Sequence, residues 1–289
     1  MRAEGALALL VVSVFLCMSA QVTAQGPCQE DGLVAYWQFA EGQGETAFDL
    51  CEGSNGVIHG GTRVDGKVNG AIGFDGVDDY IDFGNPEPLA IAQEITVLMW
   101  VWVERQPTEA YELLYKPGSY VLYLYQKGDT CMVMGAVTAG GKSSHPQRES
   151  ELSYGRWCQV GFVFGVFDKT GIKKLGNIVD GQVVASAPLD GDMPVTSNSL
   201  LLNARHLHRV AIDDLRIYDR ALAPQEIEDV YVAALSETEA RTRSQTHAVP
   251  AVALYRNNRV VVAAISTVPF LLCIAIIVRR VLRTQQDRH

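Results

Sequence analysis

The stretch FDGVDDYIDFG, residues 74–84, places four aspartates among aromatic and aliphatic side chains. Carboxylates gathered in a loop can bind a calcium ion, which takes six to eight oxygen ligands. They can also form turns, because aspartate side chains hydrogen-bond to nearby backbone groups. For Asp75 and Asp78 the sequence leaves turn formation and calcium binding open, and Asp79 is also a candidate contact for a bound ligand. Asp82 is predicted to be an ordinary surface residue of the following strand.

The same acids could instead serve an enzyme. Hydrolysis of a glycoside needs two carboxylates that face a cleft, and no such pair is evident from the sequence. The acids of EIED, residues 226–229, lie at the start of an expected helix, where the helix dipole explains them. A GxSxG nucleophile motif is absent. We therefore interpret the chain as a non-enzymatic protein without catalytic residues.

Both ends of the chain carry apolar stretches that are typical of export and membrane anchoring. Arg2 precedes an apolar run, which predicts a signal peptide over residues 1–24, with an uncleaved anchor as the alternative. Residues 260–278 carry no charge and, at about 1.5 Å per residue, would span roughly 28 Å, so we predict a transmembrane helix there. The arginines of the tail, residues 279–289, predict a single-pass protein with a cytoplasmic C-terminus and the N-terminal domain outside.

Charge and cysteine content agree with an exported domain. The formal net charge of −9 argues against nucleic acid as a partner and favours a divalent cation, Ca²⁺, as a cofactor. Four cysteines fall in the exported part, and an even number in an oxidising compartment predicts two disulfides. Three connectivities are open, and we favour the pairs nearest in sequence, Cys28–Cys51 and Cys131–Cys158.

Short β-prone runs separated by turn signals fill most of this exported part. The runs cover residues 33–39, 71–74, 80–84, 95–103, 120–125, 131–137, 157–167 and 209–219. Asp180-Gly181 predicts a hairpin within NIVDGQVV. The pattern predicts an all-β, two-sheet antiparallel sandwich or jelly roll over residues 25–235.

One short helix is expected after the last strand. Pro224 suits its first turn, and an apolar stripe continues to Leu235. The following residues, 236–259, are polar and lack a stripe, so we predict a juxtamembrane stalk there.

Aromatic side chains offer a second route to ligand binding, because tyrosine rings can stack on sugar faces. Burial in the core is the alternative. Tyr123 and Tyr125 share one face of a strand, as Trp100 and Trp102 share one face of another. Alternation does not say which pair faces outward, and Tyr123 and Tyr125 are our candidates for ligand binding.

Six stretches resemble, in order, the laminin-G-like, concanavalin A-like jelly-roll family over about residues 32–235. They are GLVAYWQFAEGQGETAFDL, AIGFDGVDDYIDFG, ITVLMWVWV, the W-x-x-V of residues 157–160, NIVDGQVVASAPL and AIDDLRIYDRALAPQEI. The alternating Glu-x-Asp-x-x-Glu of jelly-roll glucanases is absent.

The resemblance implies a structural calcium ion at the edge of the sandwich, held by an aspartate of the last strand. The matching positions are Asp213 and Asp214, of which we prefer Asp214, and Glu41 is a further candidate. A pair of strand residues near Arg216 or Arg209 is the alternative. The resemblance also implies a membrane-anchored recognition or adhesion module that binds a glycan or glycoprotein. The alternative is a scaffold that uses the sandwich to bind another protein.

Overall fold

The computed structural model describes residues 27–104, 110–127, 130–146, 152–204, 209–247, 254–256 and 259–261. The predicted signal peptide, the predicted cytoplasmic tail and residues 262–278 of the predicted transmembrane helix lie outside the described residues. Within the described ranges, no helix is both long enough and apolar enough to cross a membrane.

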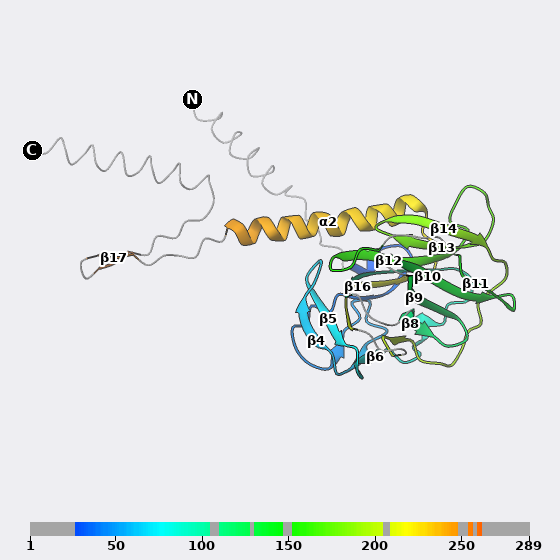
Figure 1. The fold of residues 1–289 in the computed structure, drawn as a ribbon, viewed down its shortest axis with the longest axis horizontal. Helices are drawn as coiled ribbons and strands as arrows, with labels where there is room; N and C mark the ends of the chain where they lie inside the picture. Colours follow the sequence, from blue (N-terminus) through cyan, green and yellow to red (C-terminus); the bar gives the residue numbers. More distant parts are fainter. Residues whose placement is uncertain are drawn as a thin grey trace, which may run out of the picture.

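Two antiparallel sheets pack face to face (Figure 1), as the strand pattern predicts. Sheet A has the order β14 (Gln182–Pro188), β13 (Lys174–Val179), β12 (Trp157–Gly165), β7 (Ile95–Val103), β16 (Arg209–Tyr218), β5 (Gly70–Asp75) and β4 (Thr62–Asp65), and β1 (Leu33–Trp37) pairs with the second half of β16. Sheet B has the order β11 (Lys142–Ser144), β10 (Thr130–Ala139), β9 (Tyr120–Lys127), β8 (Ala110–Lys116), β15 (Leu201–Leu202), β6 (Tyr80–Asp82), β3 (Gly56–His59) and β2 (Thr46–Ala47). Two 3₁₀ turns, η1 (Pro27–Gln29) and η2 (Glu87–Leu89), and a hairpin of β17 (Leu254–Arg256) and β18 (Arg259–Val261) complete the described elements other than the helix.

The core lies between the sheets and follows from side-chain alternation. In β6, Ile81 is buried in the core, while Tyr80 and Asp82 on either side of it are half-buried on the opposite face, as predicted. Asp180 and Gly181 both have positive φ, +46° and +78°, and they connect β13 to β14 as the expected hairpin turn. The strands absent from our prediction include the short β2, β11 and β15, whose few residues carry little periodic signal.

Helix α2 (Pro224–His247) covers the outer face of sheet A. Trp100 of β7 is buried there by the ring of Tyr231, with centroids 5.4 Å apart and planes inclined by 21°. Figure 1 shows the helix lying beside β13 and β14 and continuing past the sandwich.

The helix continues twelve residues beyond Leu235, into the polar segment that we predicted to be a stalk. Its last turns are held by the loop between β4 and β5 rather than by an apolar stripe. The Thr238 hydroxyl donates to the carbonyl of Lys67 at 2.8 Å, and Arg241 donates to the carbonyls of Val68 and Asn69 at 2.9 and 2.8 Å.

One of the two predicted disulfides is present. Cys28 and Cys51 are bonded, which confirms the first pair. Cys131 and Cys158 are free, so the second predicted pair is wrong in this structure. The two cysteines come from different sheets, β10 of sheet B and β12 of sheet A, and both lie in the core between the sheets without being bonded. Both thiols are buried in the core, and burial raises the pKa of each to about 11.

Candidate functional site

A β-bulge in the last strand of sheet A determines where its two aspartates lie. Between Asp213 and Arg216 the register of β16 against β7 shifts, and Asp214 has a φ of +53°. The extra residue interrupts the alternation that would place one of the two side chains on the outer face, so both carboxylates are buried. The Asp213 carboxylate accepts a hydrogen bond from the backbone N–H of Val68 at 2.8 Å, and burial raises its pKa to about 7.

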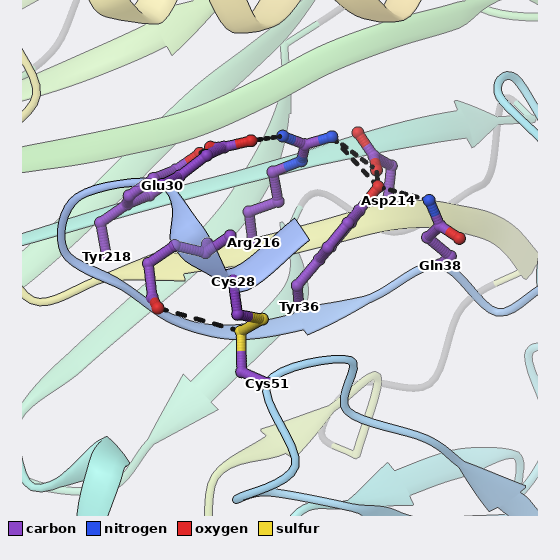
Figure 2. A network of polar contacts seen from close by, with 9 residues as sticks. Cys28, Glu30, Tyr36, Gln38, Cys51, Asp214, Arg216 and Tyr218 are labelled. Carbon is purple, nitrogen blue, oxygen red and sulfur yellow. Dashed lines mark hydrogen bonds and ion pairs between the residues drawn. A yellow bond between two sulfur atoms is a disulfide. The ribbon is translucent and has the colours of Figure 1, made fainter. Parts of the chain in front are cut away.

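Asp214 belongs to a buried polar network with Tyr36 and Arg216 (Figure 2). The Tyr36 hydroxyl donates to Oδ1 of Asp214, and Nη2 of Arg216 lies 3.3 Å from the same oxygen. Arg216 also covers the Tyr36 ring, with the guanidinium carbon 4.3 Å from the ring centroid. Its Nη1 reaches Glu30 at 3.2 Å, and Glu30 accepts a hydrogen bond from Tyr218 at 2.7 Å.

This network does not fit a calcium ion. The negative charge of Asp214 is already compensated by Arg216, and a second cation at the same oxygen would meet the guanidinium. Glu41 is likewise paired, because its carboxylate lies 2.8 Å from Arg63 and accepts a hydrogen bond from the backbone of Phe48. The alternative of a strand pair with Arg216 therefore describes Asp214 correctly, except that the pair is buried rather than solvated.

The loop between β5 and β6 gathers Asp75, Asp78 and Asp79. Among the described residues, these form the one group of three potential metal ligands whose side-chain atoms all lie within 4.8 Å of one another. Asp75 accepts from the backbone of Val77 at 2.8 Å, and Asp79 accepts from the backbone of Asp75 at 2.9 Å. The turn interpretation is thus correct for these oxygens, while one carboxylate oxygen from each of the three residues lies close enough to the others for a hard divalent cation to be held.

An open groove of about 790 Å³ lies beside this loop. Asp75, Asp79 and Arg209 line it together with the glycines of the neighbouring strands. Gly60 is required here, since a Cβ at this position would lie 1.8 Å from the carboxylate of Asp79. The groove thus presents backbone and carboxylate groups and few apolar side chains.

The outer face of sheet B carries the outward-facing tyrosines. In β9, Leu122 and Leu124 belong to the core, so Tyr123 and Tyr125 point to the opposite side, where both are half-buried. Tyr123 lies opposite Glu112 of β8, and burial, with the charge of Glu112 as a smaller contribution, raises the pKa of Tyr123.

Tyr115, Val121 and Ala136 also point outward on this face and are half-buried, while Met132 and Met134 share the face but are buried. We call this surface the tyrosine face. Trp100, by contrast, is covered by α2, and this difference decides between the two aromatic pairs that the sequence left open.

The structure does not bring all predicted site residues together. Two strands, β8 and β15, separate the tyrosines of β9 from β6, which follows Asp79. At about 4.8 Å per strand, this separation is on the order of 14 Å. Glu30 and Tyr36, which complete the Asp214 network, were not anticipated. The spacing of Asp214 and Arg216, two residues apart on one strand, was the available signal for their pairing.

The fold and these sites define a concanavalin A-like sandwich. Residues 75–228, more than half of the chain, match the family Laminin_G_3, described as the concanavalin A-like lectin/glucanases superfamily. The chain therefore belongs to this family. Comparison with curated protein sequences gave no match.

Solved structures share the fold at low sequence identity. Domain 4 of AbnA, an extracellular GH43 arabinanase of Geobacillus stearothermophilus solved with arabinotriose, is 19% identical with a TM-score of 0.54, and the match covers 69% of this chain and 98% of that one. The binding domain of Paraclostridial Mosquitocidal Protein 1 is 15% identical with a TM-score of 0.56, over 70% and 52%. The sialidase of Trypanosoma rangeli, solved with sialic acid, is 17% identical with a TM-score of 0.52, over 70% of this chain and 33% of that one. At these identities the likeness shows the fold alone.

Proposed function

We propose that this chain is a membrane-anchored recognition module that binds a glycan or glycoprotein outside the cell through the tyrosine face. The observation that carries this proposal is the outward row of Tyr115, Tyr123 and Tyr125 beside Glu112. Aromatic rings stack on the apolar face of a sugar, and a carboxylate accepts hydrogen bonds from its hydroxyl groups. Two of the similar structures were solved with arabinotriose and with sialic acid, which supports a carbohydrate as the ligand class.

The anchoring part of the proposal rests on the sequence. The signal peptide and the single apolar span near the C-terminus would export the sandwich and hold it at the membrane surface. The disulfide between Cys28 and Cys51 is consistent with an oxidising compartment.

We also propose a calcium site, which is independent of the glycan-binding surface. We place it at Asp75, Asp78 and Asp79, because these carboxylates converge and the Asp214 network does not fit a cation. When bound, the ion would tie the loop between β5 and β6 together and stabilise the rim of the groove. The proposal assigns no reaction to the chain and treats it as a binding protein rather than an enzyme.

A scaffold that binds another protein is the second candidate. The tyrosine face favours this candidate because tyrosine side chains are common at protein interfaces. A protein partner would use the flat face as a whole, whereas a sugar would depend on individual rings.

Binding of the purified full chain in detergent to a glycan array tests the proposal. We expect retention of a related set of sugars, and loss of that signal in Tyr123→Ala and Tyr125→Ala. Trp102→Ala is the matched control, because Trp102 is a half-buried aromatic residue of sheet A that contacts Trp157. A folded chain that retains no sugar would reject the glycan and favour the scaffold.

A further inference from the structure

A small hollow lies at one end of the tyrosine face, beside the turn that joins β8 to β9. It measures about 180 Å³ and is open to solvent. Tyr115, Val121 and Ala136, which come from three adjacent strands, form one part of its lining. All three are half-buried, so part of each side chain remains accessible.

Hydroxyl groups form another part of the lining. Thr138 of β10 and Ser143 of β11 lie opposite each other, with their side-chain oxygens 3.0 Å apart. Each hydroxyl can donate one hydrogen bond and accept others, so the pair keeps hydrogen-bonding capacity after bonding internally. The hollow thus offers apolar surface that includes the Tyr115 ring and hydrogen-bonding groups that include the hydroxyls of Thr138 and Ser143.

The charged groups around the hollow indicate the charge of the ligand that it can bind. Among the described residues, Lys116 is the one charged residue in the lining, and its ammonium group is engaged by Asn85 at 2.7 Å and by the carbonyl of Asn198 at 3.0 Å. Lys116 is buried, and burial lowers its pKa. A bound carboxylate or sulfate would therefore find no available cation among the described residues of this lining.

We infer that this hollow binds one neutral sugar residue at the end of a glycan, with Tyr115 stacking on the ring and Thr138 and Ser143 bonding to its hydroxyls. The inference rests on the proposed function and specifies its ligand class. A sugar ring has an apolar face and a polar edge, which matches the two parts of the lining. The glycan would continue along β9, where same-face residues recur about every 7 Å, over Tyr123 and then Tyr125.

The test uses the full chain in detergent and pairs of glycans that differ only in a terminal sialic acid or sulfate. We expect the neutral member of each pair to bind at least about tenfold more tightly. Tyr115→Ala should weaken binding about tenfold, while Tyr115→Phe, which keeps the ring, should stay close to the unmodified chain. The near-isosteric pair Thr138→Val and Ser143→Ala should together weaken it about tenfold, as expected for lost hydrogen bonds. Thr46→Val, on the far edge of sheet B, is the matched control.

The outcomes separate this inference from the proposed function. If Tyr123→Ala abolishes binding while Tyr115→Ala and the two hydroxyl variants have no effect, sugar binding in the hollow is rejected. Glycan binding by the tyrosine face is then retained. Preference for the sialylated or sulfated member would also overturn it. Failure of every sugar to bind a folded chain would overturn both proposals. A melting curve for each variant establishes that the sandwich is intact.

Discussion

Arg216 and Asp214 form an ion pair across the β-bulge of the last strand, with Nη2 3.3 Å from Oδ1 and the carboxylate almost fully buried. The side chain of Arg216 thus supplies the positive charge at the position where the family resemblance implies a calcium ion. At this edge of the sandwich, a side chain of the protein compensates the negative charge of Asp214.

Removing the arginine should be costly. Arg216→Met leaves Asp214 buried and without its cation, which we expect to lower the free energy of unfolding by about 3–5 kcal/mol. Denaturant unfolding measures the change. Arg156→Ala is the control, because Arg156 pairs with Asp180 at 3.1 Å near the surface, and such pairs contribute about 0–1 kcal/mol. A loss below about 1 kcal/mol in Arg216→Met would show that the ion pair is dispensable.

Calcium should act at the acidic loop and not at the bulge. If the ion binds at Asp75, Asp78 and Asp79, calcium at about 100 times its Kd should stabilise the fold by about 2.7 kcal/mol. Asp78→Asn should remove the calcium-dependent shift in Tm, because Asp78 is an exposed member of the cluster. In Asp214→Asn the stability should fall but the shift should remain. If the melting curves with calcium and with chelator are identical, the proposed calcium site is rejected.

Asp213 should make stability depend on pH. Burial raises its folded pKa to about 7, with the neighbouring charge of Asp214 as a smaller cause, from an unfolded value near 3.9. The folded state therefore binds the proton more tightly, and stability falls as pH rises from about 4 to about 7, by up to about 4 kcal/mol.

Asp213→Asn should become more stable relative to the unmodified chain over that pH range, as followed by denaturant unfolding. The control is Asp168→Asn. The hydrogen bonds from Lys174 and Thr170 lower the pKa of Asp168 to about 2, so its contribution to stability changes only below about pH 4, and the difference for Asp168→Asn should stay constant from about pH 4 to about pH 7. A difference for Asp213→Asn that does not change with pH would mean that this carboxyl is ionised throughout.

The cysteines should react in two classes. Alkylation in denaturant without reductant should modify Cys131 and Cys158, while Cys28 and Cys51 should react only after reduction. Peptide mass mapping identifies each site. Without denaturant, the two buried thiols should stay unmodified, because burial suppresses the thiolate. A peptide that links Cys131 to Cys158 would contradict the structure.

Removing the disulfide between Cys28 and Cys51 should lower the free energy of unfolding. The disulfide joins residues 23 positions apart, and closing a loop of this size stabilises a fold by about 3 kcal/mol. The double substitution Cys28→Ser and Cys51→Ser should lower the free energy of unfolding by about that amount.

The sequence predicted the architecture well because alternation and turn chemistry act locally. The Asp180-Gly181 hairpin and the full extent of β7 needed no knowledge of distant residues. The bulge was not predicted, although Ile212, Leu215 and Ile217 are all core residues and the step of three from Ile212 to Leu215 breaks the period-two alternation. Which aromatic pair remains accessible could not be decided from the sequence either, because the answer depends on which sheet α2 covers.

The end of α2 was missed for a related reason. Residues 236–247 lack an apolar stripe, and the helix is held instead by loop carbonyls that lie some 170 positions earlier in the chain. Periodicity cannot report such contacts, because they join polar groups of distant segments.

Helix α2 also sets how the sandwich would be presented. Its 24 residues extend for about 36 Å, and they are fixed to sheet A by Tyr231, Thr238 and Arg241. With the proposed anchor following this helix in the chain, the tether leaves from sheet A and the tyrosine face lies on the other side of the molecule. Such a display suits ligands carried by an opposing surface or dissolved in the surrounding medium, rather than sugars on the membrane that holds the protein.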